Sequence, residues 1–90
     1  MKEDKDIYMS GGTEIMDEFI GHLKEIRNDV DFENCEELVT GGYLSSLDII
    51  QIVAMIHSIY GVTIPVSRIL PSNFNSAGKL WGLVEDLIDD

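Results

Sequence analysis

Two adjacent serines, Ser45 and Ser46, stand between a turn-forming glycine pair and a run of apolar residues. The apolar residues repeat at helical spacing until Gly61, which predicts a helix that begins at Ser46 and is capped by the side chain of Ser45. The first turn of a helix presents N–H groups without an intrahelical partner and about half a positive charge. An anionic group on the exposed hydroxyl of Ser46 would be stabilised there, and phosphate is the obvious candidate.

Catalysis by Ser46 would require a general base within hydrogen-bonding reach and an oxyanion hole. The sequence holds two histidines, His22 and His57. His57 follows Ser46 by eleven residues, which at 1.5 Å per residue is about 16 Å along one helix, so the two cannot share a proton. His22 lies among acidic residues of the first predicted helix, where a solvated surface position is expected. The sequence therefore argues against a hydrolase, and no residue is assigned a catalytic role.

The acidic residues gather in clusters that could suggest a metal site. None of the clusters has the alternating ligands and the glycine turn of a calcium loop. We interpret them as solvated charge and expect no metal site; they comprise Glu33, Glu36 and Glu37 in the middle of the chain and Asp86, Asp89 and Asp90 at its end.

Ninety residues suffice for one small domain without a deep catalytic cavity, and we expect a monomer. The formal charge of -11 makes nucleic acid and anionic membranes poor partners and favours a basic protein surface. The single cysteine, Cys35, excludes an internal disulfide, and we expect it to be a half-buried hydrophobe. The sequence shows no signal-peptide pattern and no membrane-spanning stretch, so we expect a cytoplasmic protein without membrane insertion.

The spacing of apolar residues predicts an all-α fold, a small four-helix bundle with a long loop between helices 1 and 2 and a short third helix. Residues 1–12 are expected to form a flexible N-terminal tail, and residues 13–90 the domain. Thr13 is expected to cap the first helix, which ends near Asn28 or Asp29 and has Ile15 on its apolar face. The long loop is expected to be held across the bundle by its apolar residues Phe32, Leu38, Val39 and Leu44.

The second helix is predicted to span residues 46–60. Pro65 is expected to begin the short third helix and Pro71 to end it, and Ser76 to cap the last helix. That last helix has an apolar stripe made up of Leu80, Trp81, Val84, Leu87 and Ile88. A strand is conceivable only at residues 61–64, where polar and apolar residues alternate briefly.

The second helix carries too many apolar residues for a single stripe that faces the core. We assign its core face to Ile52, Val53, Ile56 and Tyr60. A second face, continuous with Ser46, is expected to contact partner proteins and comprises Leu47, Ile50 and Ala54.

In order and spacing, residues 13–88 resemble an acyl carrier protein. The resemblance rests on a serine-leucine-aspartate motif at the start of an apolar helix, joined to two further motifs at family-like distances. These segments are Gly42-Tyr43-Leu44-Ser45-Ser46-Leu47-Asp48, Gly61-Val62-Thr63-Ile64-Pro65 and Asn73-Phe74-Asn75-Ser76. The family usually has aspartate where Ser45 stands here. The Gly-Tyr-Leu-x-Ser wording is more similar to stand-alone carriers served by an AMP-forming ligase, such as the D-alanyl carrier proteins, than to carriers of fatty-acid synthesis.

The resemblance implies that Ser46 receives a 4'-phosphopantetheine arm from coenzyme A, which holds an acyl or aminoacyl group as a thioester. It implies three partners: a phosphopantetheinyl transferase, an acyl- or aminoacyl-activating ligase, and acyl-transfer enzymes. In the family the residue matching Asp48 helps the transferase dock, and the leucine matching Leu47 is presented to partners. Two alternatives remain, a D-alanyl-type carrier and an unmodified helical adaptor that binds a partner through its second helix.

Overall fold

The structure, a computed structural model, describes residues 11–89. Its elements are helix α2 (Gly11–Ile26), helix α3 (Ser46–Tyr60), the short 3-10 helix η1 (Val66–Arg68), helix α4 (Pro71–Phe74) and helix α5 (Ala77–Asp89). Within this part of the chain there is no strand, so residues 61–64 are an extended connection. The expectation of a small all-α bundle is confirmed.

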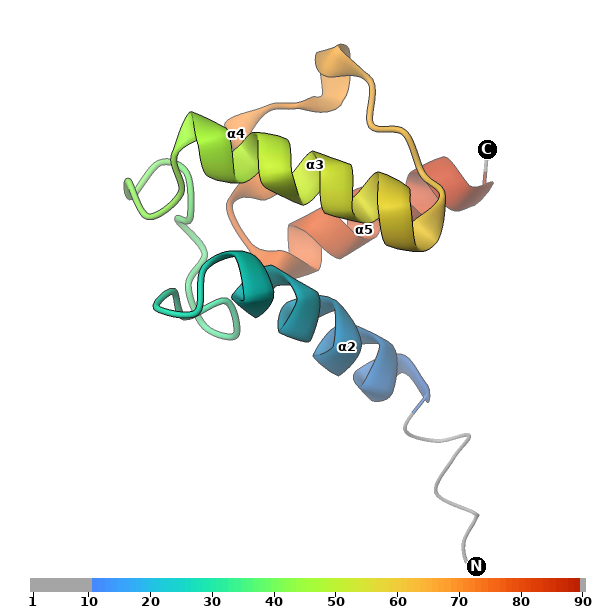
Figure 1. Cartoon of the computed structure of the whole chain (residues 1–90), viewed down its shortest axis with the longest axis horizontal. Helices are drawn as coiled ribbons and strands as arrows, with labels where there is room; N and C mark the ends of the chain where they lie inside the picture. Colours follow the sequence, from blue (N-terminus) through green and yellow to red (C-terminus); the bar gives the residue numbers. More distant parts are fainter. Residues whose placement is uncertain (1–10, 90) are drawn as a thin grey trace, which may run out of the picture.

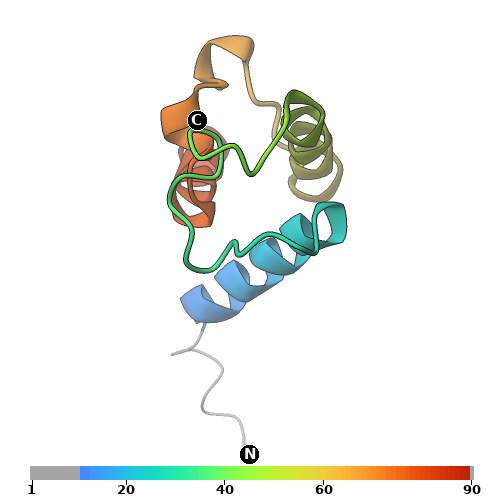
Figure 2. The ribbon, with the colours of Figure 1, turned by 90° about the vertical axis from the view of Figure 1, so that its left-hand side faces the viewer.

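Helix α2 packs against both α3 and α5, and α4 packs against α5 (Figure 1). The long loop leaves the end of α2, passes beside the start of α5 and returns to the start of α3 (Figure 2). Its middle is hydrogen-bonded to the junction between α4 and α5, where Leu38 N donates to Asn75 O over 3.0 Å. The loop that leads to Ser46 is therefore tied to the junction between α4 and α5.

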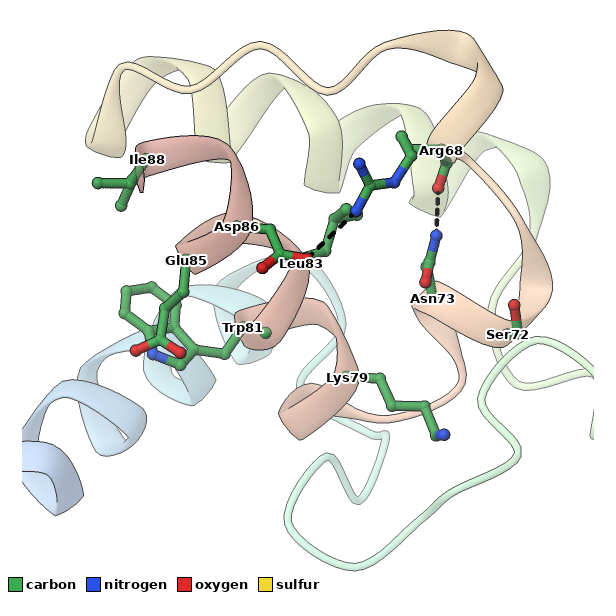
Figure 3. A pocket seen from close by; sticks show the side chains of 10 residues that line it. Arg68, Ser72, Asn73, Lys79, Trp81, Leu83, Glu85, Asp86 and Ile88 are labelled. Carbon is green, nitrogen blue, oxygen red and sulfur yellow. Dashed lines mark hydrogen bonds and ion pairs between the residues drawn. The ribbon is translucent and has the colours of Figure 1, made fainter. Parts of the chain in front are cut away.

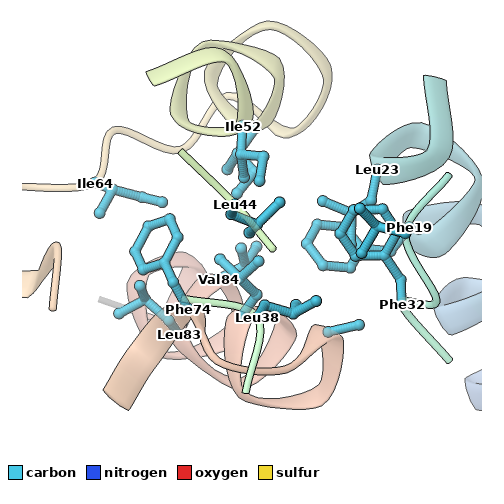
Figure 4. Packing of buried hydrophobic residues seen from close by; sticks show 14 of the residues in the cluster. Phe19, Leu23, Phe32, Leu38, Leu44, Ile52, Ile64, Phe74, Leu83 and Val84 are labelled. Carbon is cyan, nitrogen blue, oxygen red and sulfur yellow. The ribbon is translucent and has the colours of Figure 1, made fainter. Parts of the chain in front are cut away.

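The core forms where the helices and this loop meet, and Figure 4 shows side chains from α2, α3, α5 and the loop pointing toward one another. Three of the four loop residues expected to hold the loop, Phe32, Leu38 and Leu44, are buried, and the fourth, Val39, is half-buried against the core. The other buried apolar side chains are Phe19, Leu23, Val30, Ile52, Ile56, Val62, Ile64, Phe74, Ala77, Leu80, Leu83 and Val84.

Helix α2 differs from the expectation at both ends. It begins at Gly11, so Thr13 lies inside the helix and does not cap it, and it ends at Ile26. The first N–H groups of a helix need no intrahelical acceptor, which lets α2 start ahead of its apolar repeat. Residues 1–10 of the expected tail lie outside the described residues.

Two apolar residues assigned to helix stripes lie outside the core. Ile15 and Ile88 are exposed, because each lies near the outer end of its helix, beyond the region where the helices meet. The core residue Leu83 of α5, by contrast, was not part of the predicted stripe.

The two prolines both start helices. Pro65 precedes η1 as its N-cap, as expected, but Pro71 occupies the first turn of α4 instead of ending a helix. In the first turn of a helix the backbone N–H has no acceptor within the helix, so a proline, which lacks this N–H, loses no hydrogen bond there. Its fixed φ angle also suits that position. The expected third helix is therefore the short η1, and α4 is a further helix that the sequence did not predict.

Helix α3 has the predicted bounds and the predicted faces. Gly61 ends it in a left-handed conformation, with a φ of 71°, and donates its N–H to His57 O. Ile52 and Ile56 are fully buried, whereas Leu47 and Ile50 are each 63% exposed. The helix therefore has a core face and a separate apolar face toward solvent.

Truncation of these two faces should have very different effects on stability. Ile56→Ala should lower the free energy of unfolding by about 2 to 5 kcal/mol, because it leaves a cavity in the core. Ile50→Ala removes the same atoms from an exposed position and should cost about 0.5 kcal/mol or less. Urea unfolding of both variants checks this, and equal losses would show that the faces of α3 are assigned wrongly.

Asn75 clips the long loop to the junction between α4 and α5. Its Oδ1 accepts from the backbone N–H groups of Val39 and Thr40, over 3.0 and 3.1 Å. The next residue, Ser76, accepts from Lys79 N over 3.1 Å and so caps α5, as expected. One short polar segment thus holds the loop and starts the last helix.

Asn75→Ala should destabilise the protein by about 1 to 3 kcal/mol, because two N–H groups of the loop lose their acceptor. Asn75→Asp keeps an oxygen at the same place and should retain most of the stability. Thermal unfolding at neutral pH distinguishes the two variants. If both lose the same amount, the acceptor oxygen is not what holds the loop.

Candidate functional site

A tight turn precedes the two serines. Gly42 has a φ of 82°, in the left-handed region that favours glycine. A Cβ on Gly41 would lie 2.5 Å from Glu37 O and 2.9 Å from the ring of Tyr43, so no side chain fits there. The glycine pair identified in the sequence is therefore required by the turn that delivers the chain to Ser45.

The first turn of α3 is closed by a capping box. Ser45 Oγ accepts from Asp48 N over 3.2 Å, and Asp48 Oδ2 accepts from Ser45 N over 2.9 Å. These bonds satisfy two of the four N–H groups that a helix leaves free at its start. The N–H groups of Ser46 and Leu47 remain without an acceptor inside the helix.

The two serine hydroxyls have different surroundings. Ser45 Oγ is engaged by both the N–H and the carboxylate of Asp48, the latter at 3.1 Å. Ser46, exposed like Ser45, occupies the first position of α3, and its hydroxyl has no hydrogen-bond partner within residues 15–88. Ser46 therefore offers a free hydroxyl beside two free N–H donors.

The sequence placed Asp48 on the partner surface, and the structure corrects this. Asp48 is buried, and its Oδ2 lies 2.7 Å from Arg27 Nη1 as well as within bonding distance of Ser45. The hydrogen bond from Ser45 N and the bonds from the Arg27 guanidinium and the Ser45 hydroxyl hold the pKa of Asp48 below its usual range. Its charge is used inside the fold, to join α2 to α3.

Arg27 is a site residue that sequence reasoning missed. Its Nε and Nη2 donate to the two carboxylate oxygens of Asp29, each over 3.0 Å, and its Nη1 also donates to Tyr43 O over 3.2 Å. Hydrogen bonds to Asp29 and Asp48 raise the pKa of Arg27, and the guanidinium lowers the pKa of Asp29. The only sequence signal was a basic residue within a strongly acidic stretch, which does not identify its partner.

The exposed side of α3 beyond Ser46 is apolar. Leu47, Ile50 and Ala54 are all exposed there, as predicted; we call them the apolar face of α3. Tyr43 in the preceding turn is 53% exposed. Because Asp48 is the only acidic residue in α3 and is buried, this helix presents no carboxylate to solvent.

The histidines have neighbours of their own. His57 Nδ1 lies 3.2 Å from Thr63 Oγ1, near the end of α3 opposite to Ser46. His22 is half-buried, with its ring against the edge of Tyr60, and is not the solvated residue that was expected. Burial and the nearby Glu18 raise the pKa of Tyr60.

A hollow of about 900 Å³ lies between η1, α4 and α5 and includes none of the predicted site residues. Arg68 reaches across it to Asp86 over 3.4 Å, and Asn73 donates to Arg68 O (Figure 3). Both charges of that pair are therefore already compensated.

Cys35 is half-buried and free, as expected. Across residues 11–89, no group of three or more His, Cys, Asp or Glu side chains is placed to hold a metal ion. Over the same residues, no helix has the length and apolar character needed to cross a membrane.

No family model matches the chain, and searches of curated proteins and of solved structures also found no match. The functional assignment therefore depends on the residues of the site.

The lowered pKa of Asp48 predicts a loss of stability in acid. A carboxylate with a folded-state pKa below its ordinary value of 3.8 stabilises the protein above that value and ceases to do so as the pH falls through the folded pKa. The free energy of unfolding of the wild type should therefore fall, relative to that of Asp48→Asn, between about pH 5 and pH 2. Urea unfolding over this range measures the difference.

Glu36→Gln, which removes an exposed carboxylate of the loop between α2 and α3, is the matched control and should follow the wild type. The same pH dependence in wild type and Asp48→Asn would contradict the role of this carboxylate in stability.

Proposed function

We propose that this protein is a carrier protein, a covalent platform for other enzymes, and that Ser46 carries a 4'-phosphopantetheine arm. The observation that carries the proposal is a difference in hydrogen bonding: both serines are exposed, but the Ser45 hydroxyl is bonded within the helix cap, whereas that of Ser46 is free of partners within residues 15–88. The resemblance to acyl carrier proteins supports the same residue.

The residues around Ser46 fit such a group. The phosphate of the arm is anionic, and the start of α3 provides the N–H groups of Ser46 and Leu47 and the positive end of the helix dipole. The nearest carboxylate on the helix, Asp48, is paired with Arg27 and directed into the fold. The added charge therefore meets donors and no exposed acid of α3.

Attachment requires a transferase, because no general base within residues 15–88 is hydrogen-bonded to the Ser46 hydroxyl. Ser46 Oγ forms a bond to the phosphorus that carries pantetheine in coenzyme A. The bond from that phosphorus to the other phosphate of the diphosphate breaks, adenosine 3',5'-bisphosphate leaves, and the serine proton passes to a base of the transferase. Once bound, the arm supplies a terminal thiol that holds a carboxylic acid as a thioester, which remains reactive toward acyl transfer.

The apolar face of α3 is the proposed surface for the transferase, the activating ligase and the acyl-transfer enzymes. A partner that covers Leu47 and Ile50 gains by removing apolar area from water, since both are 63% exposed. The helix offers no exposed carboxylate, so electrostatic attraction by α3 contributes little to docking. The sequence of residues 42–46 favours an aminoacyl cargo of D-alanyl type. A cytoplasmic location would give the protein access to coenzyme A.

The second candidate is an unmodified adaptor that binds a partner through α3. It is favoured by the same exposed apolar face, which needs no arm to associate with another protein. The covalent state of Ser46 separates the two candidates.

The test is incubation of the unmodified protein with coenzyme A and a broad-specificity phosphopantetheinyl transferase, followed by intact mass measurement. The wild type should gain one arm and Ser46→Ala none, because the hydroxyl that forms the ester is absent. Circular dichroism of Ser46→Ala should match that of the wild type, since Ser46 does not cap α3.

Ser45→Ala is the matched control. It should still gain the arm, while losing about 0.5 to 2 kcal/mol of stability with the helix cap. Modification of Ser46→Ala would refute the assignment of the site, and a wild type that stays folded and unmodified would favour the adaptor.

A further inference from the structure

We propose that Arg27 is a positioning residue for Ser46, acting through Asp48 and the backbone of Tyr43; this inference rests on the proposed function. Arg27 follows the last residue of α2 and lies 21 residues before Asp48 in the sequence. It makes its bonds on both sides of Ser46 along the chain. We call Arg27, Asp29, Asp48 and the Tyr43 carbonyl the Arg27 latch.

The guanidinium of Arg27 is held at a fixed angle. Its Nε and Nη2 form two parallel bonds to Asp29, each 3.0 Å long, in the bidentate geometry typical of arginine and carboxylate. This leaves Nη1 directed at Asp48 Oδ2, 2.7 Å away, and at Tyr43 O, 3.2 Å away. One rigid fork therefore joins the end of α2 to the turn that carries Ser46.

The latch holds residues that precede and follow Ser46 in the sequence. Tyr43 O is held three residues before it, and Asp48 is held two residues after it. The same Asp48 Oδ2 accepts from Ser45 N and Ser45 Oγ, so the cap and the latch share one oxygen. Without Arg27, that oxygen is left buried with a charge that the cap alone must satisfy, and the first turn of α3 gains freedom.

Motion in the first turn of α3 should impair the reaction of the Ser46 hydroxyl more than the binding of a partner to the apolar face. In-line attack on phosphorus depends on the placement of the attacking oxygen, and a misplacement of about 1 Å is enough to slow a reaction strongly. The hydrogen bonds of Arg27 go to Asp29, Asp48 and the Tyr43 carbonyl, and none goes to a residue of the apolar face of α3. Loss of the latch should therefore reduce the turnover number for attachment of the arm while leaving the KM for the carrier nearly unchanged.

The full-length unmodified protein, coenzyme A and a broad-specificity phosphopantetheinyl transferase provide the assay. Arg27→Gln should lower kcat about tenfold at a temperature where the variant is fully folded. Arg27→Lys should not restore the rate, because a lysine cannot make the two bonds to Asp29 and the two bonds of Nη1 together. Lys24→Gln removes another ion pair between α2 and the loop, that with Glu33, and should react at the wild-type rate.

Amide hydrogen exchange gives a readout that does not depend on the arm. In Arg27→Gln the N–H groups of Ser45 and Asp48 should lose about tenfold in protection, while that of Ile56 in the core stretch of α3 keeps its protection. Lys24→Gln should leave all three unchanged. The exchange data therefore separate a local loosening of the turn from a general loss of stability.

Three results would overturn the inference: an unchanged kcat in Arg27→Gln, full activity in Arg27→Lys, or equal losses of protection at Asp48 and Ile56. A wild type that gains no arm would refute the proposed function and the role of Arg27 in attachment with it. In that case, the exchange data still decide whether Arg27 holds the turn.

Discussion

The carboxylate of Asp48 is the point on which the arrangement of this small protein depends. One of its oxygens accepts from the Ser45 backbone, the Ser45 hydroxyl and the Arg27 guanidinium, so the helix cap, the long loop and the end of α2 meet at a single atom. A buried charge is tolerated only when it is paired and hydrogen-bonded, and both conditions are met here. The start of α3 is thereby placed relative to α2 by directed bonds, where apolar packing alone would let it slide.

The loop between α2 and α3 shows how a segment without regular structure can still be placed accurately. Its buried apolar side chains, among them Phe32, Leu38 and Leu44, supply the free energy of burial, but apolar contacts have little directional preference. The path of the loop is fixed by directed hydrogen bonds. Asn75 accepts two loop N–H groups, and Leu38 O accepts from the N–H groups of both Tyr43 and Leu44. A long ordered loop of this kind is typical of functional segments in small domains.

Local signals in the sequence predicted helix α3 and its capping by Ser45 well, because caps and apolar periodicity are encoded within a few residues. Ser45, Gly61 and the buried pair Ile52 and Ile56 all lie where these signals placed them. The Arg27 latch could not be predicted, since an ion pair between residues 21 positions apart depends on how the loop closes. The same limit explains the error at Asp48, whose motif position suggested an exposed acid although its environment is set by Arg27, which follows the end of α2.

The pairing of Asp48 also bears on the chemistry proposed for Ser46. An unpaired carboxylate in the first turn would oppose the positive end of the helix and repel a phosphate two residues away. Arg27 pairs with this carboxylate, so Asp48 can serve the cap while its charge is partly compensated near an anion on Ser46. The solvent face of α3 carries no acidic residue, because Asp48 is the one acid of this helix and is buried. The fold thus keeps a negative charge at the start of α3 for stability and still leaves the exposed serine in surroundings suited to an anion.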